Sequence, residues 1–184
     1  MDIKEKFIKD FPIIKGNKKE PYIITFDAYT GQGKSYVSKI ISKYDNSIIV
    51  NNDDLRYWLN DYSKTNDLLH DLQKYRINEL LKNNNSIILD SCSCVNWDYK
   101  KEYLDKSGYK YYIIRLECDD NTVKERINKR LTEDNNTSHG TYEDYIWMKE
   151  NVSHIDNVDY IIDTSKNIEE QVLDFLNKYN LNNI

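Results

Sequence analysis

The chain has 184 residues, of which 39% are hydrophobic and 31% charged, with a formal charge of −5. This length suits one domain with a substantial core, and this composition excludes an intrinsically disordered chain. The acidic balance argues against a protein that wraps long nucleic acid, because such binding depends on a basic stripe. Recognition of one terminal phosphate by one or two arginines stays open.

The N-terminal segment is charged throughout, unlike a signal peptide, and no stretch of the sequence is long enough to span a membrane. The three cysteines, Cys92, Cys94 and Cys118, fit no disulfide framework and no zinc spacing. Reduced thiols are typical of cytosolic proteins. We therefore expect a cytoplasmic protein that makes no membrane contact, and the oligomeric state stays open.

The first elements are an N-terminal extension and a strand followed by a helix. Residues 1–20 predict an amphipathic helix and a polar turn. The apolar run at residues 23–26 predicts a strand that enters a parallel sheet. After Ser35 the apolar residues recur at helical spacing, which predicts a helix from about Lys34.

Four more apolar runs follow, and helical patterns separate them. The expected strands cover residues 47–50, 86–89, 111–116 and 160–162. Helices are expected over residues 66–82, 97–106, 142–151 and 168–179, and two more are expected to begin at about Asp53 and about Asn121. Residues 133–140 are expected to form a polar loop. This alternation predicts a three-layer α/β/α fold with a five-stranded parallel sheet, in a single domain over residues 1–184.

The most informative motif crosses the first strand–helix junction. Residues 28–35 read A-x-x-x-x-G-K-S, the P-loop pattern with Ala28 in place of its first glycine. Gly31 and Gly33 let backbone amides turn toward phosphate oxygens, and the N-terminus of the next helix adds its positive dipole end. The motif has the strand, loop and helix that it requires, so we predict a nucleotide site here.

Two side chains of this loop have specific roles in binding Mg·ATP. Lys34 is placed for the β- and γ-phosphates, and the hydroxyl of Ser35 for Mg²⁺. The predicted nucleotide-binding residues of the loop are Gly31, Gln32, Gly33, Lys34, Ser35 and Tyr36.

Polar residues follow the second and third strands, at the sheet edge where ligands bind in such folds. Asp53 and Arg56 are one helical turn apart, so Asp53 can accept a hydroxyl proton while Arg56 holds the acceptor. Asp90 can anchor the water shell of Mg²⁺ or orient the acceptor. The structural alternatives are a helix N-cap for Asp53 or Asn52, a solvated helix residue for Arg56 and a turn cap for Asp90.

Arg126 and Arg130 are four residues apart, on one face of a predicted helix ahead of the polar loop. Many small kinases close a basic lid over the triphosphate, and we assign the lid to about residues 126–142. An ordinary charged helix surface is the alternative.

Histidines and tryptophans give weaker signals. His70, His139 and His154 have no obvious partner and are interpreted as surface or satisfied residues. Trp58 is interpreted as a packing residue, with a place near the acceptor pocket as the alternative.

Together these motifs indicate a family. Residues 28–35, residues 51–56, Asp90, and the pair Arg126 and Arg130 resemble the kinase domain of bacteriophage-type 5′-polynucleotide kinases. More broadly, the chain is similar to small P-loop kinases that include zeta toxins and chloramphenicol phosphotransferases. Ala28 departs from the family pattern.

The resemblance implies a role for each matching residue. Asp53 falls on the general base and Arg56 on the contact to the acceptor phosphate. Arg126 and Arg130 fall on the lid arginines, and Asp90 on an acidic position of the active site. Adenine would lie between the lid helix and the loop after the last strand, around Thr164.

The sequence thus predicts an ATP- and Mg²⁺-dependent kinase with an alcohol acceptor, first of all the 5′-OH end of a polynucleotide. One alternative is a kinase of a nucleotide, nucleoside or other small metabolite. Another is a nucleotide-binding module without transfer chemistry.

Overall fold

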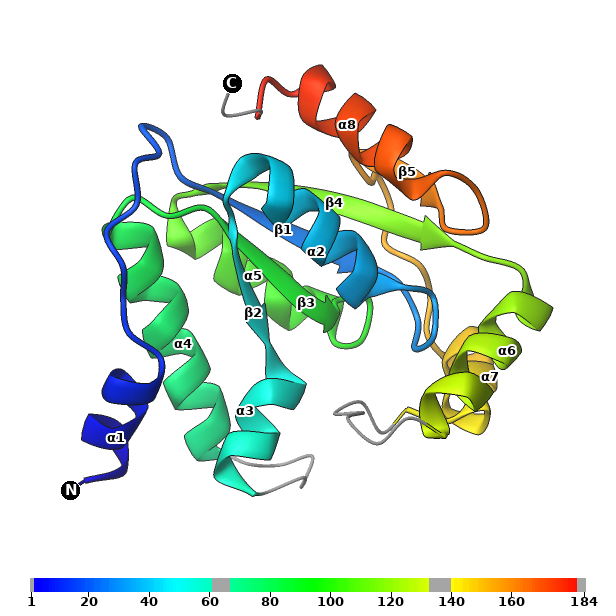
Figure 1. The fold of residues 1–184 in the computed structure, drawn as a ribbon, viewed down its shortest axis with the longest axis horizontal. Coiled ribbons are helices and arrows are strands. Elements are labelled where there is room, and N and C mark those ends of the chain that lie inside the picture. The colour runs from blue at the N-terminus through cyan, green and yellow to red at the C-terminus, as the bar shows by residue number, and fades with distance from the viewer. Residues whose placement is uncertain (1, 61–66, 133–139, 182–184) are drawn as a thin grey trace.

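The computed structural model describes residues 2–60, 67–132 and 140–181. They form an α/β/α fold of three layers around one sheet (Figure 1). The strands are β1 (Tyr22–Asp27), β2 (Ile48–Asn51), β3 (Ile87–Cys92), β4 (Lys110–Glu117) and β5 (Tyr160–Asp163). The helices are α1 (Ile3–Asp10), α2 (Lys34–Asp45), α3 (Asn52–Leu59), α4 (Asp67–Lys82), α5 (Trp97–Ser107), α6 (Asp120–Leu131), α7 (Tyr142–Asn151) and α8 (Ile168–Lys178).

The sheet is parallel throughout and has the order β2-β3-β1-β4-β5. The central strand β1 is buried along its whole length, because helices cover both faces of the sheet. Every strand therefore ends at the same edge, where Asn51 of β2 pairs in register with Asp90 of β3. The predicted five-stranded parallel sheet is confirmed.

Side chains that alternate along β1 enter two different cores. Ile24 and Phe26 pack with α2 and α8, which lie side by side on one face. Ile23 faces the other side and packs with α4 and α5. A second cluster on that side joins α6 and α7 to β4 through Ile113 and Val123. Burying apolar side chains on both faces is what makes each strand an uninterrupted apolar run.

The N-terminal helix α1 lies against α3 and α4 through Phe7, which is almost completely buried. The ring of Trp58 packs edge-on against Phe7 at 5.6 Å between centroids, and its Nε1 donates to Asp10 at 2.9 Å. Trp58 is therefore a packing residue, as interpreted, and does not have its alternative place near the acceptor pocket.

The predicted element boundaries shift by a few residues. Ser47 stays outside β2 because its backbone N–H and its hydroxyl both bond to the carboxylate of Asp45. The third strand continues past the predicted residue 89 to Cys92, with a register shift between Thr25 and Phe26 of β1. Within the described part of the chain, no helix combines the length and apolarity needed to cross a membrane.

Candidate active site

The P-loop connects β1 to α2, and two of its residues have left-handed backbone. Gly31 has φ +77° and Gly33, the N-cap of α2, has φ +94°. A Cβ on Gly31 would lie 2.8 Å from Ile127 and 2.9 Å from Val123, both on α6. Glycine is therefore required at position 31 for its conformation and for the close approach of the loop to α6.

Two side chains of the loop bond back to its own backbone. The Oε1 of Gln32 accepts from the backbone N–H of Tyr29 at 2.6 Å, and Lys34 Nζ donates to the carbonyl of Tyr29 at 2.9 Å. The side chain of Gln32, predicted to bind nucleotide, is buried and supports the loop. Ser35 and Tyr36 lie in the first turn of α2, and both are exposed.

The carboxylate of Asp90 lies beside the P-loop. It accepts a 2.9 Å hydrogen bond from Nδ2 of Asn51, and the hydroxyl of Ser35 is near enough to lower its pKa. Burial raises the pKa of Asp90, these two groups and the charge of Lys34 oppose the rise, and the charge of Asp53 adds to it. Asp90 therefore interacts with both Lys34 and Asp53, so the predicted phosphate-binding and base residues share one site.

Asp53 lies in the first turn of α3 and has cations on two sides. Its backbone N–H donates to the N-cap Asn51 at 2.6 Å, and its Oδ1 accepts from Arg56 at 3.1 Å. Burial lowers the pKa of Arg130, and the charge of Asp53 offsets part of this. Asp53 is thus not the N-cap residue, and the Arg130 guanidinium comes within electrostatic range of it.

Arg126 connects α6 to the loop after β5. Its Nη1 donates to the Thr164 hydroxyl at 3.0 Å, and its Nη2 donates to the Thr164 carbonyl at 2.7 Å. A Cβ at Gly33 would lie 3.6 Å from both residues, so the pair sits directly over the P-loop. Arg130 donates to the carbonyl of Gly140. Residues 133–139 of the predicted lid lie outside the described residues.

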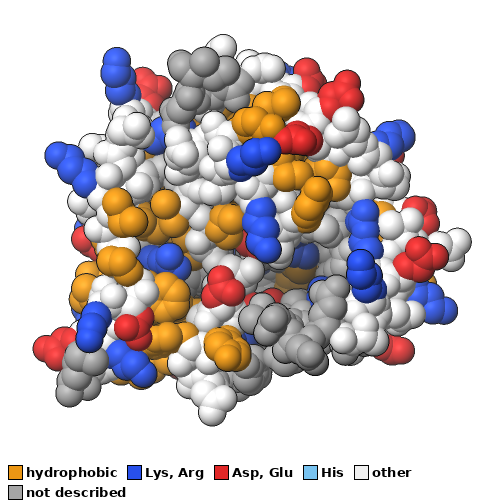
Figure 2. Space-filling view, viewed as in Figure 1, with side chains coloured by type: hydrophobic (Ala, Val, Ile, Leu, Met, Phe, Trp, Pro, Cys, Tyr) orange, Lys and Arg blue, Asp and Glu red, His pale blue; other side chains and the backbone are white. Residues whose placement is uncertain are grey.

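These elements converge on one face of the molecule. In Figure 1 the N-terminal end of α2 points toward the side of the molecule where α6 lies, and α3 begins where β2 ends. Figure 2 shows a hollow in this region with Lys and Arg side chains on its border. A basic border of this kind suits a polyanionic ligand.

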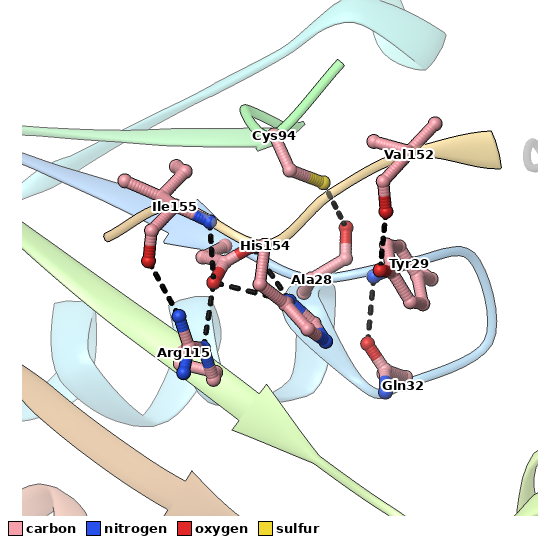
Figure 3. Close-up of polar contacts among 9 residues, drawn as sticks. Ala28, Tyr29, Gln32, Cys94, Arg115, Val152, His154 and Ile155 are labelled. Carbon is pink, nitrogen blue, oxygen red and sulfur yellow. Dashed lines mark hydrogen bonds and ion pairs between the residues drawn. The ribbon is translucent and has the colours of Figure 1, made fainter. Parts of the chain in front are cut away.

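One buried carboxylate next to the P-loop escaped the sequence analysis. Asp27 ends β1 and is completely buried; its carboxylate accepts from Arg115 Nε at 2.7 Å and from the Ile155 N–H at 3.2 Å, and it lies 3.0 Å from His154 Nδ1. The ring of His154 stacks on Tyr29 at 4.7 Å (Figure 3). His154 thus has partners. Asp27 follows the first apolar run just as Asp90 follows the third, so the same sequence signal could have identified it.

A cleft of about 640 Å³ is lined by the sequence neighbours of Asp53 and Asp90, but not by these two residues themselves. It lies between α4 and α5, and Asn52 at the start of α3 and Ser91 after Asp90 line its inner end. Lys74 of α4 and Lys100 of α5 also line this cleft. Arg126, Thr164 and Asp53 do not line it, and we refer to the P-loop region and this cleft as the two compartments of the candidate site.

The fold and the P-loop define this chain as a protein with the α/β/α fold of small P-loop kinases. A family model described as an AAA domain matches residues 24–154, and the chain belongs to that family. No curated protein matches the chain.

Three solved structures illustrate the similarity of fold. The APS kinase of Mycobacterium tuberculosis in complex with AMPPNP and APS has a TM-score of 0.62 at 16% identity, over 88% of this chain and 98% of that one. A gluconokinase from Sinorhizobium meliloti has a TM-score of 0.57 at 16% identity, over 88% of this chain and 92% of that one. A shikimate kinase from Bacteroides thetaiotaomicron has a TM-score of 0.59 at 12% identity, over 86% of this chain and 98% of that one.

Proposed function

We propose that this protein is an ATP-dependent kinase that transfers the γ-phosphoryl group to a hydroxyl of a small metabolite. The observation that carries the proposal is the position of Asp90, which interacts with the P-loop residues Ser35 and Lys34 and with Asp53. A phosphate-binding lysine and a carboxylate that can accept a proton are thereby brought to one sheet edge.

The donor compartment suits a nucleotide triphosphate. The backbone amides around Gly31 and Gly33 and the ammonium of Lys34 would bind the phosphates. Arg126 and Thr164 over Gly33 would contact the nucleotide, and Arg130 would take up charge on the transferring group. Lys34 would exchange its bond to the Tyr29 carbonyl for the phosphates.

Mg²⁺ fits the oxygen atoms that this site offers. The hydroxyl of Ser35 and the carboxylate of Asp90 are adjacent hard ligands beside the P-loop. No group of three acidic, histidine or cysteine ligands occurs among the described residues, and Mg²⁺ commonly uses one or two protein ligands plus phosphates and water. When bound, the ion would neutralise charge on the β- and γ-phosphates.

We place the acceptor in the second compartment, the cleft between α4 and α5. Asp53 would accept the hydroxyl proton as the acceptor oxygen bonds to the γ-phosphorus and the bond to the ADP oxygen breaks. Arg56, at 3.1 Å from Asp53, would hold the acceptor in line. The similar structures include kinases named for APS, gluconate and shikimate, which supports a small acceptor.

A second candidate is the 5′-OH end of a polynucleotide. Arg56 favours it, because a guanidinium beside the proposed base can bind the phosphate next to a terminal sugar. The formal charge of −5 weighs against extended nucleic-acid contacts.

Incubation with γ-labelled ATP and an acceptor panel tests the proposal. The panel contains hydroxy acids, sugars, nucleosides, nucleotides and 5′-OH oligonucleotides, with Lys34→Ala as the inactive control. We expect label on a small metabolite and none with the control. Label on oligonucleotides, with a salt dependence of roughly −0.7 per phosphate contact on a log–log scale, would support the second candidate. ATP binding without transfer to any hydroxyl would indicate a binding module.

A further inference from the structure

Lys100 is a lysine in the lining of the cleft. It lies on α5 and donates from Nζ to the carbonyl of Cys92 at 2.7 Å. Burial lowers the pKa of Lys100, the nearby Cys92 and Cys94 thiols oppose this, and the charge of Lys34 lowers it further. The two ammonium groups are therefore close enough to repel each other.

Among the residues that the structure describes, no carboxylate forms an ion pair with Lys100, although Asp67 and Asp71 line the same cleft. The other lysine of the cleft differs, because Lys74 interacts with Asp71 and bonds to the Tyr99 hydroxyl at 2.9 Å. A partly buried ammonium without a counter-ion is costly. An anion arriving in the cleft would remove that cost.

The neighbouring groups can complete an anion site. An ammonium has three N–H donors, and the bond to Cys92 uses one of them. The hydroxyls of Ser91 and Ser93 line the same cleft. Asn52 also lines it, and its buried Oδ1, which has no partner among the described residues, can accept a hydrogen bond from a hydroxyl of the ligand but not from the anionic group.

We propose that Lys100 binds an anionic group, a phosphate, sulfate or carboxylate, on the small-molecule acceptor. The inference rests on the proposed function for the identity of the ligand as an acceptor. It deepens that function by defining the substrate class as anionic metabolites that carry a free hydroxyl. The anion would lie at Lys100 and the reacting hydroxyl at Asp53.

The test measures anion binding directly by calorimetric titration with inorganic phosphate, sulfate and acetate. Each titration is run with the P-loop saturated by Mg·AMPPNP and again without nucleotide. We expect Lys100→Met to weaken binding of at least one anion about tenfold or more, and Lys100→Arg to stay within a few-fold of the wild type. The three anions distinguish phosphate, sulfate and carboxylate sources.

The matched control is Lys101→Met, which removes the next lysine of α5, an exposed residue paired with Asp105. It should leave anion binding unchanged, and thermal unfolding of each variant shows whether Lys100→Met merely disturbs the fold. Equal anion affinity of wild type and Lys100→Met, or no anion binding to the wild type, would overturn the inference. Failure to bind AMPPNP would instead contradict the proposed function.

With an acceptor from the panel, the same variant gives a kinetic readout. Lys100→Met should raise the KM for an anionic acceptor and leave the KM for ATP unchanged. For an uncharged analogue of that acceptor, the wild type and the variant should have the same KM. A rise in the KM for ATP alone would assign Lys100 to the donor side and overturn the inference.

Discussion

Asn51 donates a hydrogen bond from Nδ2 to the carboxylate of Asp90 at 2.9 Å. Its Oδ1 at the same time accepts from the backbone N–H of Asp53 at 2.6 Å. One amide side chain at the end of β2 thus holds the backbone of Asp53 and the carboxylate of Asp90. The start of α3 and the end of β3 are held together at the residues to which we assign proton and Mg²⁺ chemistry.

Asn51→Ala should therefore reduce stability as well as activity. It removes a helix N-cap and a hydrogen bond to a buried carboxylate, at an expected cost of about 1–3 kcal/mol. Urea unfolding measures this cost. Asn51→Ser keeps a capping oxygen and should recover part of it. An unchanged unfolding midpoint for Asn51→Ala would show that the two hydrogen bonds contribute little.

Asp53→Asn should separate binding from transfer. The substitution keeps the shape of the side chain and removes its basicity, so ATP affinity should persist while transfer falls by ~10²–10⁴. Binding of a fluorescent ATP analogue and single-turnover transfer measure the two effects. Asp54→Asn, at the exposed neighbouring position, is the control and should leave transfer within a few-fold. Full turnover in Asp53→Asn would exclude Asp53 as the base.

Asp90→Asn should stabilise the ligand-free protein at neutral pH and abolish Mg²⁺-dependent transfer. Burial raises the pKa of Asp90 in the folded state, so ionisation of this carboxyl reduces stability. In acid, where the carboxyl is protonated in both states, variant and wild type should be equally stable. The advantage of the variant should appear as the pH rises through the unfolded-state pKa of about 3.9, and level off above the folded-state pKa.

Denaturant unfolding from pH 3 to pH 7 checks this prediction for Asp90. A stability difference between Asp90→Asn and the wild type that is the same at every pH would contradict it. Such a result would place the effect in packing and not in the charge.

Arg115→Met should be the most destabilising of these substitutions. It leaves the completely buried carboxylate of Asp27 without its 2.7 Å ion pair, and breaking a buried pair typically costs about 3–5 kcal/mol. His154 and the Ile155 N–H still contact Asp27, so the lower end of that range is expected.

The double variant Arg115→Met with Asp27→Asn should recover part of the stability, since no unpaired charge remains buried. Unfolding in urea measures both proteins. If the double variant is the less stable of the two, the loss is due to packing of the Arg115 side chain and the role assigned to the ion pair is wrong.

Much of this fold could be predicted from the sequence, because strands buried on both faces must be continuous apolar runs. The run at Ile23 and Ile24 and the run at residues 111–116 both identified central strands in this way. The P-loop could be predicted because its chemistry is local in sequence. The grouping of Asp53 with Asp90 followed from one rule, that parallel strands end at a common edge.

Other features depend on contacts between distant segments and have no local signal. Asp27 meets Arg115 and His154, which lie 88 and 127 residues further along the chain. The packing of Trp58 depends on the N-terminal helix α1. The environment of Lys100 likewise arises only when α5 folds beside the P-loop lysine. The assigned roles of Asp53, Arg56, Arg126 and Arg130 remain predictions until the variants are measured.

The absence of a side chain on Gly31 has a mechanical consequence. Because Gly31 lacks a side chain, the phosphate-binding loop lies directly against Val123 and Ile127, which are three residues before and one residue after Arg126 on α6. The phosphate-binding loop and the arginine-bearing turn of α6 are consequently in direct contact, so a shift of one displaces the other. A larger residue at position 31 would therefore distort the phosphate-binding loop and misplace the arginines of α6 at the same time.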